Sequence, residues 1–272
     1  MRFSFPSKLL FQFLLLCVFL FSTEVFSQKP AKDSLDQYSF KELSSKFNTA
    51  LLKDDKLARI YAEKILSDSK SRNSTIGIIT SYGNFASLEN QLGNTEKALE
   101  FIDKAISLAK QDPKYMASEA YSSFTKGKIL YYTGQYKKAF KYYTIAYDYY
   151  KKIGLKNPLN TLSLSIALIK NNLGDHQTAI ELLLKCQENY ENTPEHQHPK
   201  LFPGDYKPSV LLGLSNAYMK YAIKKTSKKD SLLNIAADYN TLGLKEAIHK
   251  KNKAYEIRFI IGDGIIAEER GN

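Results

Sequence analysis

Apolar residues recur every three or four positions over most of this chain, which is the spacing that places them on one face of an α-helix. One such run is Ala98, Ile102, Ala105, Ile106 and Ala109. All eight prolines fall outside the helices predicted from this pattern. We therefore predict an all-α chain without a β-sheet.

The helical pattern repeats. A glycine followed five residues later by an alanine occurs in Leu92–Ala98, Thr133–Ala139 and Leu173–Ala179. The three alanines lie 41 and 40 residues apart, and Ala58 lies 40 residues before the first of them. Each unit reads as two helices, with the glycine ending the first one because glycine tolerates a left-handed backbone. The spacing predicts four helix pairs within residues 38–190.

The 40-residue spacing is interrupted after the fourth unit. Residues 191–208 hold four of the eight prolines and few apolar residues, so we expect a proline-rich loop. The helical pattern resumes at Ser209, and Ala236 lies 57 residues after Ala179, so about 17 residues are inserted here. We expect residues 209–272 to hold one more helix pair and the first helix of the next.

That last helix is predicted over Tyr255–Arg270. Gly264 and Gly271 fall where the repeat places its small residue and its turn glycine, so the chain is expected to stop inside a repeat. Ile260–Ile266 offers an alternative, since it also resembles two short strands around an Asp-Gly turn. Without a second helix, several apolar residues would lack part of their cover: Phe259, Ile260, Ile261, Ile265 and Ile266.

The first 27 residues have the pattern of a secretory signal peptide. Arg2 and Lys8 precede the apolar run Leu9–Phe21, and a short, more polar segment follows. The alternative is a retained anchor, but these thirteen residues would span only about 20 Å as a helix, against roughly 30 Å for a bilayer core. We predict a cleaved signal peptide at 1–27, a flexible mature terminus at 28–37, and a periplasmic or otherwise extracytoplasmic protein.

The charge balance is basic, at +11 for the whole chain. Export argues against a nucleic-acid partner, and the lysines are spread widely, as expected for a solvated helical surface. Attraction to an acidic partner or to an anionic membrane surface is the alternative. Cys186 is the one cysteine beyond the signal segment, so the mature chain cannot form an internal disulfide.

The repeat resembles the tetratricopeptide repeat over roughly residues 38–271. One unit meets the family's pattern of small and bulky residues with Gly127, Gly134, Ala139, Tyr143 and Ala146. The units here are longer than the standard 34 residues, as in repeats similar to those of bacterial regulators and their sensory regions. The resemblance implies an α-solenoid of antiparallel helix pairs wound as a right-handed superhelix.

No catalytic motif stands out. His196 and His198 form the only metal-like pair, and a polar loop explains them better than a metal site. His176 and His249 read as surface residues, and Cys186 occupies a packing position. We predict no catalytic residue, no metal and no cofactor, so the chain is not expected to be an enzyme.

The resemblance implies a concave groove lined by the first helix of each pair, where a protein or peptide binds. Exposed tyrosines suit such an interface. The alternative is that the chain is the extracytoplasmic sensory region of a longer membrane-anchored signalling protein, a transcriptional regulator or histidine kinase. The predicted groove residues are Tyr121, Phe124, Lys128, Tyr131, Leu168, Asn171 and Asn216.

Overall fold

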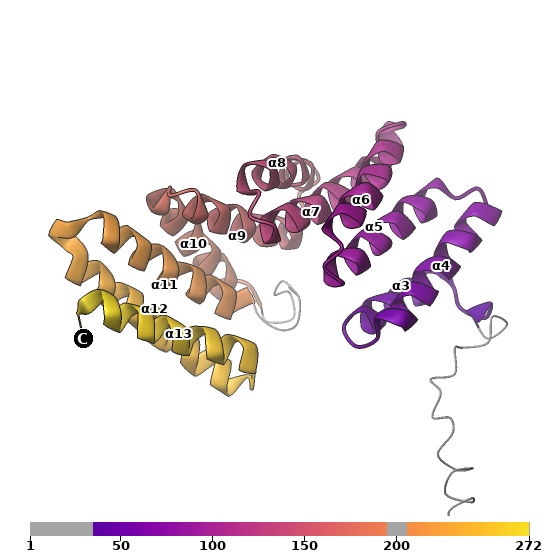
Figure 1. Ribbon diagram of the computed structural model, residues 1–272. Helices are drawn as coiled ribbons and strands as arrows, with labels where there is room; N and C mark the ends of the chain where they lie inside the picture. Colours follow the sequence, from indigo (N-terminus) through magenta and orange to yellow (C-terminus); the bar gives the residue numbers. More distant parts are fainter. Residues whose placement is uncertain (1–34, 195–205, 272) are drawn as a thin grey trace, which may run out of the picture. The chain divides into compact units, whose positions relative to one another are not determined.

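A computed structural model of the chain describes residues 35–194 and 206–271 (Figure 1). Within these residues every regular element is helical, so the prediction of an all-α fold is confirmed. No helix in this part of the chain is both long and apolar enough to span a membrane. The α-helices are α3 (Phe40–Leu51), α4 (Asp55–Ser71), α5 (Thr75–Gln91), α6 (Thr95–Ala109), α7 (Met116–Tyr132), α8 (Tyr136–Lys152), α9 (Lys156–Asn172), α10 (His176–Glu191), α11 (Tyr206–Lys224), α12 (Lys229–His249) and α13 (Lys253–Arg270).

The chain divides into two compact units at Asp68, within α4. In the first unit, Ser39 and Glu42 form a capping box at the start of α3, in which each side chain accepts a hydrogen bond from the other residue's backbone N–H. Phe47 is buried, and Ala58 on α4 is fully buried as its place in the 40-residue register predicts. The predicted signal peptide, 1–27, lies outside the described residues.

In the second unit, each helix from α5 to α13 packs against the next along the chain, and α5–α7, α9–α11 and α11–α13 also touch. The first helices of neighbouring pairs therefore contact one another as well as their own partners. This is the packing of an α-solenoid, in which a lone helix pair cannot bury its apolar face and neighbours complete the core.

Glycine-ended turns join the helices of the pairs α5–α6, α7–α8 and α9–α10, as predicted. At Gly93, Gly134 and Gly174 the backbone is left-handed, with φ of +80°, +74° and +87°. The residue after each glycine donates its N–H to a carbonyl five residues earlier, which satisfies an otherwise unpaired group at the helix end. These hydrogen bonds are Asn94 to Glu89 (2.8 Å), Gln135 to Leu130 (2.8 Å) and Asp175 to Lys170 (2.9 Å).

The alanines that define the register lie at packed helix crossings. Ala98, Ala139, Ala179 and Ala236 are all fully buried, which confirms the spacing. The slim residues seven positions later, at Ala105, Ala146 and Cys186, are buried too. Small side chains at these positions let the backbones of two helices approach closely, and larger apolar residues fill the remaining space.

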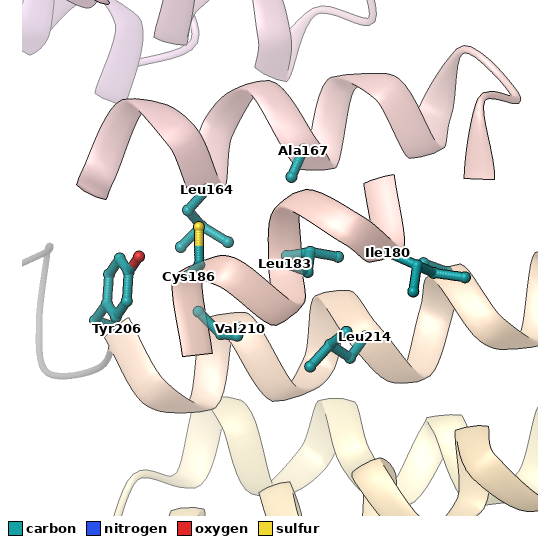
Figure 2. Close-up of a cluster of buried hydrophobic side chains, with 9 residues drawn as sticks. Leu164, Ala167, Ile180, Leu183, Cys186, Tyr206, Val210 and Leu214 are labelled. Atoms are coloured by element: carbon teal, nitrogen blue, oxygen red, sulfur yellow. The ribbon is translucent and has the colours of Figure 1, made fainter. Parts of the chain in front are cut away.

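The core between α9, α10 and α11 spans the insertion (Figure 2). Its α11 part begins at Tyr206, three residues before the predicted start at Ser209, and residues 195–205 lie outside the described chain. The Tyr206 hydroxyl donates a hydrogen bond to the carbonyl of Asn160 on α9, at 3.2 Å. The buried members of this core are Leu164, Ala167, Ile180, Leu183, Cys186, Tyr206, Val210, Leu214 and Ala217.

Two prolines of the described chain lie inside α-helices, contrary to the prediction that all would fall outside helices, and Pro113 begins a short 3₁₀ helix. Pro158 is the third residue of α9, and Pro208 is the third residue of α11. The first turn of a helix tolerates proline because the N–H groups there have no partner within the helix. The sequence pattern alone placed both helix starts too late to include them.

The last described segment, Lys253–Arg270, forms helix α13, so the alternative of a β-hairpin at Ile260–Ile266 is wrong. The helix ends at Gly271 with φ of +79°, as the register predicts. A buried amide fixes it in place: Asn240 on α12 donates hydrogen bonds to the carbonyl of Phe259 (2.7 Å) and to Asp263 (2.6 Å).

Candidate functional site

Four of the seven predicted groove residues lie along α7. Tyr121, Phe124, Lys128 and Tyr131 are spaced by three or four residues and so follow one side of the helix. Two of them are anchored by the fold. The Phe124 ring lies 5.7 Å from that of Tyr143, and the Tyr131 ring lies 5.6 Å from each of two further tyrosine rings. The aromatic side of α7 is thus held in place by its neighbours.

Tyr121 is the most exposed of these four residues of α7. Its side chain is 53% exposed, so solvent reaches it. Surrounding protein nevertheless raises the pKa of its hydroxyl by desolvation. A tyrosine that is accessible but partly shielded from water offers apolar area and a polar tip to a ligand at a small desolvation cost.

Lys128 lies on the same side of α7, one helical turn beyond Phe124. Its side chain is partly buried, and desolvation lowers the pKa of its ammonium group from 10.5 to about 8. Holding a charge in such surroundings costs free energy. Lys128 also lies between Phe124 and Tyr131 on one side of α7, which makes it a candidate contact for an anionic group of a ligand.

We expect Lys128→Met to stabilise the second unit by about 1–2 kcal/mol at pH 7, because methionine removes the desolvated charge. The effect depends on pH. Below pH 8 the folded and unfolded chains both hold the proton, and the cost is fully present. Between about 8 and 10.5 the unfolded chain holds more protons, so this side chain's contribution to the unfolding free energy rises with pH.

Urea unfolding of the wild type and of Lys128→Met at pH 7 and pH 9.5 tests this prediction. The difference in unfolding free energy between the two proteins should shrink at the higher pH. Other groups titrate alike in the two proteins and cancel in that difference. A variant that is less stable than the wild type at pH 7 would show that the ammonium group contributes more than its burial costs.

A polar link that the sequence reading missed joins three first helices. Asn172 at the end of α9 donates a hydrogen bond to the Tyr131 hydroxyl of α7 (3.4 Å) and accepts one from Lys220 of α11 (3.3 Å). Burial raises the pKa of Tyr131, whereas the charge of Arg258 on α13 acts to lower it. The face that begins on α7 therefore continues across α9 and α11 with cationic groups along it.

The remaining predicted residues lie elsewhere. Leu168 packs against the core between α9, α10 and α11. Asn171 is only 5% exposed, and its Oδ1 lies 2.7 Å from Nδ1 of His176, which is buried rather than at the surface as predicted. Asn216 on α11 is half-buried. We define the α7 face by Tyr121, Phe124, Lys128, Tyr131 and Asn172.

Metal ligands do not gather in the part of the chain that the structure describes. There, no three residues among histidine, cysteine, aspartate and glutamate come together as metal ligands would. Cys186 is buried, and desolvation raises the pKa of its thiol, which disfavours the reactive thiolate. His196 and His198 lie outside the described residues.

Comparison with known proteins gives matches to repeat proteins. The sequence profile of the tetratricopeptide repeat matches residues 77–152, which cover α5 to α8. No curated protein matched the sequence.

Solved structures of similar fold include a Rap protein complexed with Competence and Sporulation Factor, with 15% identity and a TM-score of 0.55 over 87% of this chain and 68% of that one. BtubC from P. vanneervenii is 15% identical, with a TM-score of 0.52 over 86% and 85% of the two chains. The nearly identical TPR-like repeats of a Podosopora anserina protein assigned as a kinesin light chain are 14% identical, with a TM-score of 0.54 over 74% and 94%.

At sequence identities this low, the similarity to these structures shows the fold and nothing further. They agree with the profile match, with the glycine-ended turns and with the buried alanines of the 40-residue register. Residues 77–152 thus match the tetratricopeptide repeat, and the described chain has the fold of a TPR-like α-solenoid.

Proposed function

We propose that this protein is an exported, non-catalytic scaffold that binds a protein or peptide on its α7 face. The observation that carries the proposal is the row of Tyr121, Phe124, Lys128 and Tyr131 along one side of α7, in which the Tyr121 side chain is 53% exposed and Lys128 is partly buried. Aromatic side chains and a lysine on one accessible side of a helix supply apolar contact area and a positive charge to a ligand.

The charge of the face indicates the kind of ligand. Lys128 and Lys220 lie along it, and Arg258 acts on Tyr131 from α13. An extended segment with acidic residues would complement these cations, while its apolar side chains would contact the tyrosine rings. A protein of the same fold, Rap, was solved with Competence and Sporulation Factor bound, which supports a binding role for such an array.

Export rests on the amino-terminal pattern of positive residues followed by the apolar run Leu9–Phe21. The proposed partner is accordingly a component of the cell envelope or of the extracellular medium. In this compartment the fold would be stabilised by burial of apolar surface, without disulfides.

The test is capture of partners from a cell-envelope extract by the wild type and by Tyr121→Ala with Lys128→Met. We expect the double variant to lose at least about tenfold in affinity for the captured partner, because hot-spot residues each contribute 1 kcal/mol or more. Thermal unfolding of the double variant, followed by circular dichroism, shows whether it stays folded, so that lost binding can be separated from unfolding.

The matched control is Lys141→Met with Tyr149→Ala, which changes the same residue types on α8. It should leave the affinity within about twofold of the wild type. Equal affinity of the wild type and the Tyr121/Lys128 variant for a captured partner would remove the α7 face as the binding surface.

A further inference from the structure

Helix α13 has a large apolar surface on the side facing away from the protein. Its buried side is formed by Phe259, Gly262 and Ile266. On the opposite side Ile257, Ile260 and Ile261 are 57%, 56% and 56% exposed. At 100° per residue these isoleucines and Gly264 lie within one stripe, directly opposite the buried side.

This clustering is unusual within the described chain. Other exposed large apolar residues are spread along the helices and turns, as with Ile76 on α5 and Leu184 on α10. Single exposed apolar residues need no explanation, whereas a contiguous patch marks an interaction surface.

The stripe is complementary to itself when reversed. The midpoint between Ile260 and Ile261 is also the midpoint between Ile257 and Gly264, and between Lys253 and Glu268. A two-fold axis at this point would place Ile257 of one copy against Gly264 of the other, where the missing side chain leaves room. It would also place Lys253 opposite Glu268 at both ends.

We propose that two copies of this chain pair through α13, antiparallel, about a two-fold axis between Ile260 and Ile261. The arrangement buries the isoleucine stripe and closes it with an ion pair at each end. A parallel pair would instead face Lys253 with Lys253 and Glu268 with Glu268. Helix α13 has 18 residues and is about 27 Å long, so the interface is small and we expect a dimer of micromolar affinity. This dimer does not depend on ligand binding at the α7 face.

Sedimentation velocity of the purified chain over a concentration series tests the dimer. We expect Ile260→Asp to raise the dissociation constant about 100-fold, because it buries a charge at the centre of the interface. The control Ile76→Asp changes an isoleucine of similar exposure on α5 and should leave self-association unchanged. A wild type that stays monomeric at all concentrations overturns the proposal, as does a dimer that Ile260→Asp leaves intact.

Charge exchange tests the register. Lys253→Glu and Glu268→Lys should each weaken the dimer about tenfold, since each creates like-charge contacts at both ends. Neither change opposes the helix dipole, because Lys253→Glu puts an acid near the start of α13 and Glu268→Lys puts a base near its end. The double variant should return to wild-type affinity. If it stays as weak as the single variants, the antiparallel register is wrong.

Discussion

Ala139→Glu is expected to lower the free energy of unfolding of the second unit by about 4 kcal/mol, whereas the neighbouring Lys138→Glu should change it by about 0.5 kcal/mol or less. Ala139 is fully buried in the core that joins α7, α8 and α9, next to Tyr143 and Leu162. A carboxylate there would lose its hydration without gaining a partner. Lys138 is exposed and bonds only to Gln135 in the described structure.

Thermal and urea unfolding followed by circular dichroism check this pair. Both variants make a glutamate at adjacent positions of one helix, so helix propensity and net charge differ little between them. Similar melting temperatures for the two would mean that the 40-residue register is misplaced on α8.

Gly243→Ala is expected to destabilise the second unit by about 2 kcal/mol, although alanine favours a helix over glycine by about 1 kcal/mol. Gly243 lies inside α12, where a Cβ atom would stand 2.1 Å from Cζ of Phe259 on α13. The Phe259 ring is fully buried, so it is enclosed by neighbouring side chains. Either α13 shifts outward or the ring adopts a strained rotamer, and both cost free energy.

Gly83→Ala is the matched control. Gly83 lies inside α5, and a Cβ atom there would meet no atom within 4 Å, so this change should raise stability by about 0.5–1 kcal/mol. The two substitutions are chemically identical and should move the urea midpoint in opposite directions. If both stabilise the protein, α12 and α13 are farther apart than the close packing of Gly243 and Phe259 requires.

The sequence predicted the helices and their register because both depend on local or periodic features. A glycine that must adopt positive φ and an alanine that must fit a helix crossing recur at a fixed distance, so Gly93, Gly134 and Gly174 could be aligned without any structure. The same register decided correctly between a helix and a hairpin for Lys253–Arg270, where local composition was ambiguous.

The site was predicted less completely, because side-chain direction depends on neighbours that the insertion displaces. Asn171 and Asn172 are adjacent in sequence, but the first is buried against His176 and the second links Tyr131 to Lys220. The repeat spacing relates Asn172 to the end of α7, yet Lys220 lies beyond the inserted residues. No periodic pattern could place that lysine.

The packing of each helix against its sequence neighbours has a kinetic consequence. In the second unit the main contacts join helices that are adjacent or next but one in the chain, so few of them close a long loop. Loop-closure entropy is then small, and a low contact order favours folding in microseconds to milliseconds. The longest connection to be closed is the segment between α10 and α11, across which Tyr206 must reach α9. The slowest step of folding should therefore be the docking of α11–α13 onto the pairs that precede them.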